Sequence, residues 1–170
     1  FVGDVENILS ETPKVRQTTF FSATLPKSIR RLADNYMNEP QTIMIQRKHL
    51  TVDTVEQRYY LVNAKDKLAA VTRLFEFEDI GATLVFTKTR IGSGRVANEL
   101  IQRGFPAEAL NGDLAQDARI RVLNRFRKGQ IKVLVATDVA ARGLEIDDIS
   151  HVFNFDIPTD PEAYVNRIVR

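Results

Sequence analysis

The chain has 170 residues, 44% of them hydrophobic, and its formal charge is +2 from 24 basic and 22 acidic side chains. This content suffices for a buried core, which excludes a disordered chain and predicts one domain, or one domain with an appendage. With no cysteine and only two histidines, disulfides and thiolate metal sites are excluded, and we expect no metal centre. Neither a membrane-spanning run nor a signal peptide is visible, so we expect a soluble, cytoplasmic protein without membrane contact.

The first 45 residues predict a leading helix followed by one incomplete βαβ unit. Apolar residues at helical spacing indicate helices at 5–9 and 26–36, and β-branched or aromatic residues indicate strands at 18–21 and 41–45. So small a unit cannot bury a core of its own. Because the chain opens with the pattern of an element's interior, we expect it to be part of a longer protein.

After a polar and basic linker at residues 46–51, strand patterns alternate with helix patterns. The predicted strands are residues 55–62, 82–86, 107–110, 131–136 and 151–155. Four helices are predicted, and they begin after Asn63 or Asp66, after Gly92-Ser93-Gly94, at Asp113 and at Asp160-Pro161. Asp113 and Gln116 have the spacing of a capping box. Gly104 and Gly129 are predicted to end the second and third of these helices. This alternation predicts an α/β fold in three layers, a mostly parallel sheet with helices on both faces, of RecA-like or Rossmann-like type.

One stretch, residues 133–146, combines a continuous apolar run with a polar exit. The run is typical of a strand buried on both faces, and it is followed by Thr137, Asp138, Arg142 and Glu145. Ligands of open α/β sheets bind just beyond the carboxyl ends of the strands. The stretch therefore indicates either a binding site or an ordinary buried strand with a solvated exit loop.

Two other patterns also allow two interpretations each. The helix predicted at residues 116–128 is rich in arginine, which indicates either a solvated charged face or a phosphate-binding face. Gly92-Ser93-Gly94 is either a phosphate cradle or a plain helix entry, and the sequence contains no P-loop signature. His49 and His151 are read as linker and strand residues rather than as catalytic bases.

Four short blocks, in this order and at this spacing, together resemble the DEAD-box family of ATP-dependent RNA helicases in superfamily 2. They are Ser22-Ala23-Thr24 (motif III), residues 84–90, LVFTKTR (motif IV), Gln116-x-x-Arg119 behind residues 110–113, LNGD, and residues 136–146, ATDVAARGLEI (motif V). Residues 164–170, YVNRIVR, are similar to the start of motif VI, YVHRIGR. The resemblance covers essentially the whole chain.

The resemblance implies two RecA-like domains. Residues 1–45 would be the C-terminal remnant of the first, 46–51 the linker, and 52–170 the helicase C-terminal second domain. Such helicases bind ATP and single-stranded RNA between two lobes and unwind short RNA duplexes. ATP and Mg²⁺ are therefore the implied cofactors of the full-length protein, with the P-loop and the metal ligands outside this chain.

The resemblance also assigns roles to individual residues. RNA phosphates and riboses would be held by Thr89, Arg90, Gly112, Arg119 and Thr137. Arg170 would be an arginine finger on the transferring phosphoryl group, Glu145 and Gly143 would join it in nucleotide binding, and Arg167 would assist catalysis and lobe coupling. Coupling between the lobes would involve Ser22, Thr24 and Arg142.

Three positions depart from the family pattern. Glu145 stands where the family has Asp, Asn166 replaces a His that links the lobes, and Val169 replaces a Gly beside the implied finger. The altered motif VI keeps open a second interpretation, a non-catalytic helicase-like adaptor that docks RNA or protein. The expected partners are RNA without sequence preference, the first lobe of the same protein and, through exposed strand edges, a second copy.

Overall fold

The computed structural model describes residues 2–21, 27–43, 55–141, 144, 146 and 148–168. The chain divides into two compact units, Phe1–Arg47 and Lys48–Arg170. The division falls inside the range 46–51 that the sequence predicts as a linker. None of the helices in the described ranges is both long and apolar enough to span a bilayer.

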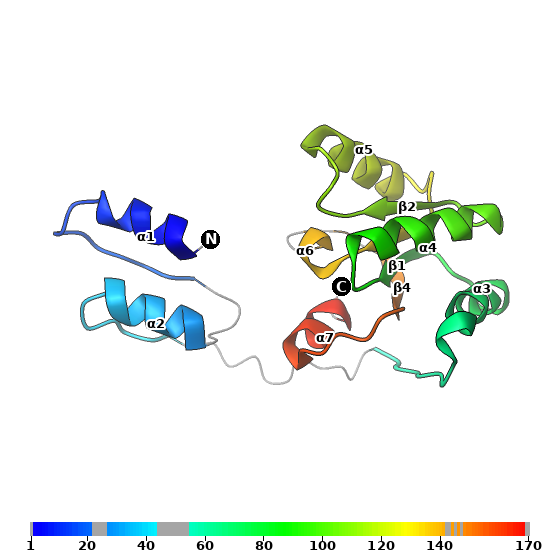
Figure 1. Ribbon diagram of the computed structural model, residues 1–170, viewed down its shortest axis with the longest axis horizontal. Helices are drawn as coiled ribbons and strands as arrows, with labels where there is room; N and C mark the ends of the chain where they lie inside the picture. The colour runs from blue at the N-terminus through cyan, green and yellow to red at the C-terminus, as the bar shows by residue number, and fades with distance from the viewer. Residues whose placement is uncertain are drawn as a thin grey trace. The chain divides into compact units, whose positions relative to one another are not determined.

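The first unit contains both predicted helices, α1 (Val2–Ser10) and α2 (Lys27–Tyr36) (Figure 1). The predicted strand at residues 18–21 is wrong, and residues 41–43 of the second predicted strand are likewise unpaired. A strand needs a neighbour for its backbone N–H and C=O groups, and the described part of this unit supplies none. None of the described core residues belongs to this unit, as its size predicts.

The second unit is built on a four-stranded parallel sheet among its described residues (Figure 1). The strands are β1 (Ala82–Phe86), β2 (Ala107–Leu110), β3 (Val133–Ala136) and β4 (Ile149–Asn154), in the order β2-β3-β1-β4. In β1 and β3 eight of the nine residues are buried, since only Ala82 is partly exposed. Both central strands are therefore covered on two faces, as their uninterrupted apolar runs predict.

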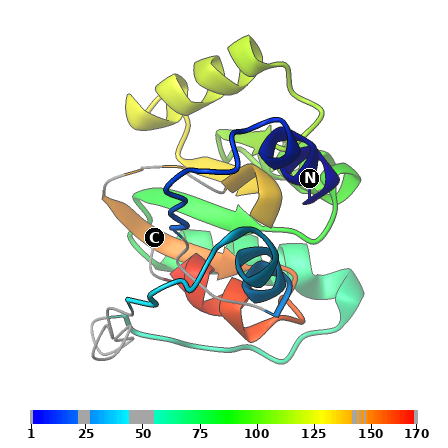
Figure 2. The ribbon, with the colours of Figure 1, turned by 90° about the vertical axis from the view of Figure 1, so that its left-hand side faces the viewer.

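Alternate side chains of the central strands enter two separate cores, one on each face of the sheet. Val85, Val133 and Val135 pack with α3 (Lys67–Phe77) and α4 (Arg90–Gln102). Leu84, Phe86, Leu134 and Ala136 pack with α5 (Gln116–Arg127) and α6 (Asp138–Ala141). Figures 1 and 2 show α3 and α5 on opposite sides of the sheet. The predicted three-layer α/β architecture is confirmed.

The last helix, α7 (Pro161–Ile168), begins where the sequence predicts. Asp160 caps it, because its Oδ2 accepts a hydrogen bond of 3.2 Å from the backbone N–H of Ala163. The two glycine stops are also confirmed, since Gly104 and Gly129 have φ values of +88° and +67°. Such left-handed conformations favour glycine after a helix.

Two predicted features of the second unit differ from the structure. Residues 55–62 are not a strand, although side chains hold them: the Tyr164 hydroxyl donates to Gln57 Oε1 at 2.6 Å, and Arg58 Nη1 donates to Glu78 Oε1 at 3.1 Å. The capping box is also wrong. Ala115 precedes α5, and the Asp113 carboxylate is paired with Arg90 instead. The Asp113 carboxylate therefore joins the loop after β2 to the first residue of α4 and does not cap α5.

Candidate nucleic-acid interface

Parallel pairing places the carboxyl ends of all four described strands at one edge of the sheet. Ala136 is the register partner of both Leu110 and Phe86, and Phe86 is also the partner of Asn154. The residues that follow these ends are Thr87–Arg90 after β1, Asn111–Asp113 after β2, Thr137 and Asp138 after β3, and Phe155 and Asp156 after β4. Thr89, Arg90, Gly112 and Thr137, four of the predicted RNA contacts, therefore come from loops that share one edge.

The loop after β1 is organised by Thr89, which caps α4. Its Oγ1 accepts a hydrogen bond of 2.9 Å from the backbone N–H of Gly92, and its carbonyl accepts from the N–H of Ser93 at 3.0 Å. The helix thus starts before the glycines, not after them as predicted. A Cβ at Gly92 would lie 2.8 Å from Thr89 Oγ1, so the cap requires glycine there. The two N–H groups are occupied, which favours the helix-entry interpretation over a phosphate cradle.

The loop after β2 is joined to the same helix start. Asn111 donates from Nδ2 to Ser93 Oγ at 3.0 Å, and Ser93 Oγ donates to the carbonyl of Arg90 at 2.7 Å. Arg90 and Asp113 form an ion pair in which both side chains remain more than 60% exposed. A Cβ at Gly112 would lie 3.8 Å from Arg90 Cδ, which places Gly112 beside that side chain.

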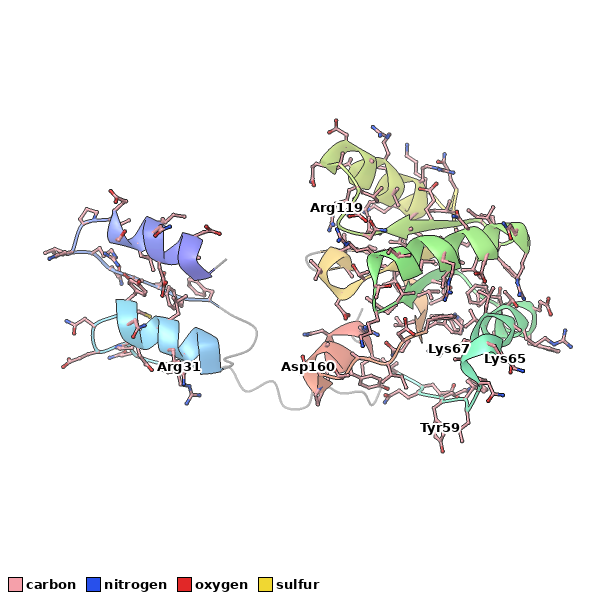
Figure 3. The ribbon with its side chains drawn as sticks, viewed as in Figure 1. Arg31, Tyr59, Lys65, Lys67, Arg119 and Asp160 are labelled. Atoms are coloured by element: carbon pink, nitrogen blue, oxygen red, sulfur yellow. The ribbon has the colours of Figure 1, made fainter. Side chains whose placement is uncertain are left out.

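The remaining two predicted RNA contacts lie deeper. Thr137 is buried, and its backbone N–H donates to the Leu110 carbonyl at 3.4 Å. Arg119 is half-buried and reaches from α5 to donate from Nη2 to the carbonyl of Ala140 at 2.7 Å (Figure 3). On the same helix, Arg125 pairs with Glu108. At least these two arginines of α5 therefore have protein partners, and the helix is not a uniformly free cationic face.

Arg167, predicted to be catalytic, is buried at 3% exposure. Its Nε and Nη2 donate to Asp138 Oδ1 and Oδ2 at 2.6 and 2.8 Å, a bidentate pair. Nη1 donates to Asn154 Oδ1 at 2.8 Å and to the Asp156 carbonyl at 2.7 Å, and the guanidinium carbon lies 4.7 Å from the Phe86 ring centroid. The Arg167 guanidinium thus joins α7 to the residues at the ends of β3 and β4, an arrangement called the Arg167 clamp below. Direct contact of this guanidinium with a nucleotide would require some of these hydrogen bonds to break.

Sequence reasoning missed Asp156, which accepts hydrogen bonds from Lys67 and from the backbone of Lys88. Its partial burial opposes ionisation, but the bonds from Lys88 and Lys67 and the charges of Lys67 and Arg167 outweigh it. The pKa of Asp156 is therefore lowered. The signal in the sequence is its position, because Asp156 directly follows the predicted strand at residues 151–155, as Asp138 closely follows the strand at 131–136.

The other predicted site residues lie outside the described residues. They are Ser22, Thr24, Arg142, Gly143, Glu145 and Arg170. His49 lies there too, whereas His151 is a β4 residue whose Nε2 lies 3.1 Å from Glu78 Oε2. Within the described ranges, no three His, Asp or Glu side chains are grouped so that they could hold a metal ion.

Comparison with known proteins identifies the family. Residues 66–170 match the family described as the helicase conserved C-terminal domain. Over all 170 residues the chain is 47% identical to the DEAD-box ATP-dependent RNA helicase CshA of Geobacillus kaustophilus and covers 36% of it. It is 44% identical to CshA of Bacillus subtilis and covers 34% of that protein. The chain thus spans about a third of the length of these relatives.

Solved structures agree with the sequence matches. S. cerevisiae Dbp5 bound to RNA and ADP BeF3 matches 99% of this chain and 45% of its own, with a TM-score of 0.85 and 32% identity. E. coli SrmB bound to regulator of ribonuclease activity A matches 62% of each chain, with a TM-score of 0.60 and 38% identity. The chain therefore belongs to the helicase conserved C-terminal domain family, and its resemblance to the DEAD-box RNA helicases is confirmed. The RecA-like form of the predicted α/β fold is confirmed as well.

Proposed function

We propose that this chain is the second RecA-like lobe of an ATP-dependent RNA helicase, together with the end of the first lobe, and that the carboxyl edge of its sheet binds the backbone of single-stranded RNA. The observation that carries the proposal is the convergence of Thr89, Arg90, Gly112 and Thr137 from three loops onto one edge. Hydrogen bonds and an ion pair tie two of these loops together. The Dbp5 structure that matches 99% of the chain holds RNA.

The proposed binding is weak and sensitive to salt. Arg90 is exposed but already paired with Asp113, so a phosphate must compete with a carboxylate for the guanidinium. Contacts to phosphates and riboses carry no sequence information, which makes the binding independent of RNA sequence. Each phosphate neutralised by a cation adds to the loss of affinity as salt concentration rises.

ATP turnover belongs to the full-length protein in this proposal. The first lobe supplies the P-loop and the Mg²⁺ ligands, and this lobe supplies Arg170, Glu145 and Gly143. Closure of the two lobes on ATP and RNA bends the strand and separates a short duplex, and hydrolysis reopens them. The 170-residue chain alone neither binds ATP tightly nor hydrolyses it. The proposed setting is the cytoplasm, with self-association through exposed strand edges as a further consequence.

Titration of a short single-stranded RNA at two salt concentrations tests the proposed interface. Arg90→Ala should weaken binding about three- to tenfold at low salt and reduce the salt dependence, because one cation is lost from the edge. The matched control is Arg95→Ala, since Arg95 lies on the same helix, is 70% exposed against 63% for Arg90, and also has a carboxylate partner. Equal affinities of the wild type and Arg90→Ala at both salt concentrations would refute the interface.

The second candidate is a non-catalytic adaptor. It is favoured by Asn166 and Val169 in motif VI and by the SrmB structure, which contains a protein partner. An adaptor would retain RNA or protein binding while its full-length form fails to hydrolyse ATP. ATP turnover by the full-length protein therefore separates the two candidates.

A further inference from the structure

Asp156 contacts the chain on both sides of Thr87, the residue after the end of β1, through its carboxylate and through its backbone N–H. Asp156 Oδ2 accepts a hydrogen bond of 3.0 Å from the backbone N–H of Lys88. The backbone N–H of Asp156 donates to the carbonyl of Phe86 at 3.1 Å. Asp156 thus fixes the direction in which the chain leaves β1, two residues before Thr89.

Lys67 holds this carboxylate in place from the first turn of α3. Its Nζ donates to Asp156 Oδ1 at 2.9 Å and to the Phe155 carbonyl at 2.8 Å, and it lies 5.2 Å from the Phe155 ring centroid. Both side chains of the ion pair are about one-third exposed. Because the Lys67 ammonium group binds two oxygens of one loop, it orients that loop and also neutralises the charge of the Asp156 carboxylate.

A carboxylate beside an RNA-binding edge cannot itself bind phosphate, because the two negative charges repel. Its contacts to the backbone give it a different role. The loop that it fixes leads directly to Thr89, which caps α4, and to Arg90, which lies beside Gly112. A change in the path of Lys88 would therefore move both predicted RNA contacts.

We propose that Asp156 is a positioning residue that presents Thr89 and Arg90 to RNA, and that Lys67 holds Asp156 in the required orientation. The inference rests on the proposed function, since it concerns the same edge. The positioning role and simple electrostatics predict opposite changes in RNA affinity when the Asp156 charge is removed. Removing the Asp156 charge makes the edge more positive, which by charge alone would strengthen RNA binding, whereas loss of positioning weakens it.

The test compares the RNA affinities of Asp156→Asn, Lys67→Gln and the double variant in the 170-residue chain at one salt concentration. Lys67 and Lys88 donate to two different carboxylate oxygens. Asparagine has an NH2 donor in place of one of them, so one of these bonds is lost, and Asp156→Asn should bind RNA about three- to tenfold more weakly. Lys67→Gln, which leaves the bond to Lys88 intact, should also weaken binding. The double variant should bind RNA clearly more tightly than the product of the two effects predicts, with an affinity close to that of Asp156→Asn, because both residues act through one loop.

The controls make the same charge changes at exposed positions away from this loop. The first control is Asp79→Asn, since Asp79 is exposed and precedes β1, at the end of the sheet opposite to the carboxyl edge. The second is Lys65→Gln, since Lys65 is exposed and lies two residues before Lys67 (Figure 3). Both should stay within about twofold of the wild type. Thermal melting shows that each variant is folded, and hydrogen exchange at the Lys88 amide should be faster in Asp156→Asn than in Asp79→Asn.

The outcomes separate the inference from the proposed function. A wild-type chain that binds no RNA overturns the proposed function, and the inference falls with it. A wild-type chain that binds RNA, with a folded Asp156→Asn that binds as tightly or more tightly, overturns the positioning role alone. Strictly additive effects of Asp156→Asn and Lys67→Gln would show that Lys67 acts directly on RNA, which also overturns it.

Discussion

At the scale of single residues, the carboxyl edge is held by buried or half-buried charges that each satisfy several partners. Arg167 contacts Asp138, Asn154 and the Asp156 carbonyl, and Asp156 contacts Lys67 and Lys88. These partners are separated by 11 to 89 positions along the chain. Sequence patterns report neighbours within a helix or strand, so they predict which residues reach the edge but not which of them pair there.

Removal of the Arg167 guanidinium should destabilise the second unit strongly. Arg167→Ala leaves Asp138 without its bidentate partner and Asn154 without its donor. We expect a loss of about 2 to 4 kcal/mol in the free energy of unfolding, less than for a fully buried pair because Asp138 is 42% exposed. Urea denaturation measures it. Arg73→Ala, which breaks an exposed pair with Glu76, should cost under about 0.5 kcal/mol, and equal losses in both variants would contradict the clamp.

The lowered pKa of Asp156 sets the pH range of its contribution. Because the folded pKa lies below the unfolded one, the contribution is complete at neutral pH and is lost as pH falls through the folded pKa. The difference in unfolding free energy between the wild type and Asp156→Asn should therefore stay constant from about pH 7 to pH 5 and shrink below about pH 4. Denaturant titrations across this range provide the measurement. A difference that already disappears near pH 6 would contradict the assignment.

At the scale of helices and strands, the sequence predicted those elements whose burial pattern is unambiguous. The predicted strands at residues 82–86 and 107–110 have those bounds in the structure, and Gly104 and Gly129 follow helices as predicted. Residues 55–62 have a strand pattern but no paired neighbour, since side-chain alternation does not specify a partner. The start of α4 was missed because glycines in its first turns were read as a loop, although Thr89 is a good capping residue.

Two glycines, one inside α4 and one after its end, should respond oppositely to substitution by alanine. Gly94 lies inside the helix with open space at its Cβ position, whereas Gly104 follows the helix with φ of +88°. Gly94→Ala should raise the unfolding free energy by about 0.5 to 1 kcal/mol, and Gly104→Ala should lower it by about 1 kcal/mol. Thermal melting of the two variants compares them directly. Shifts of the same sign would show that α4 does not end as described.

At the scale of the whole molecule, the chain spans about a third of the length of the DEAD-box RNA helicases that it resembles. The sequence identified the RecA-like fold and the family because the motif residues are contiguous in each block, and the comparisons confirm both. The side chains predicted to touch ATP, Arg170, Glu145 and Gly143, lie outside the described residues, so those assignments stay predictions. The P-loop and the metal ligands are expected on the first lobe. Nucleotide turnover is thus proposed as a property of two lobes and not of this chain.

The most direct test of this account is RNA-stimulated ATP hydrolysis by the purified 170-residue chain and by the full-length protein that includes the first lobe. We predict no turnover above background for the chain alone, with or without RNA. The full-length protein should hydrolyse ATP, and single-stranded RNA should accelerate it. Turnover by the 170-residue chain alone, or a folded full-length protein that binds RNA yet never hydrolyses ATP, would contradict the account.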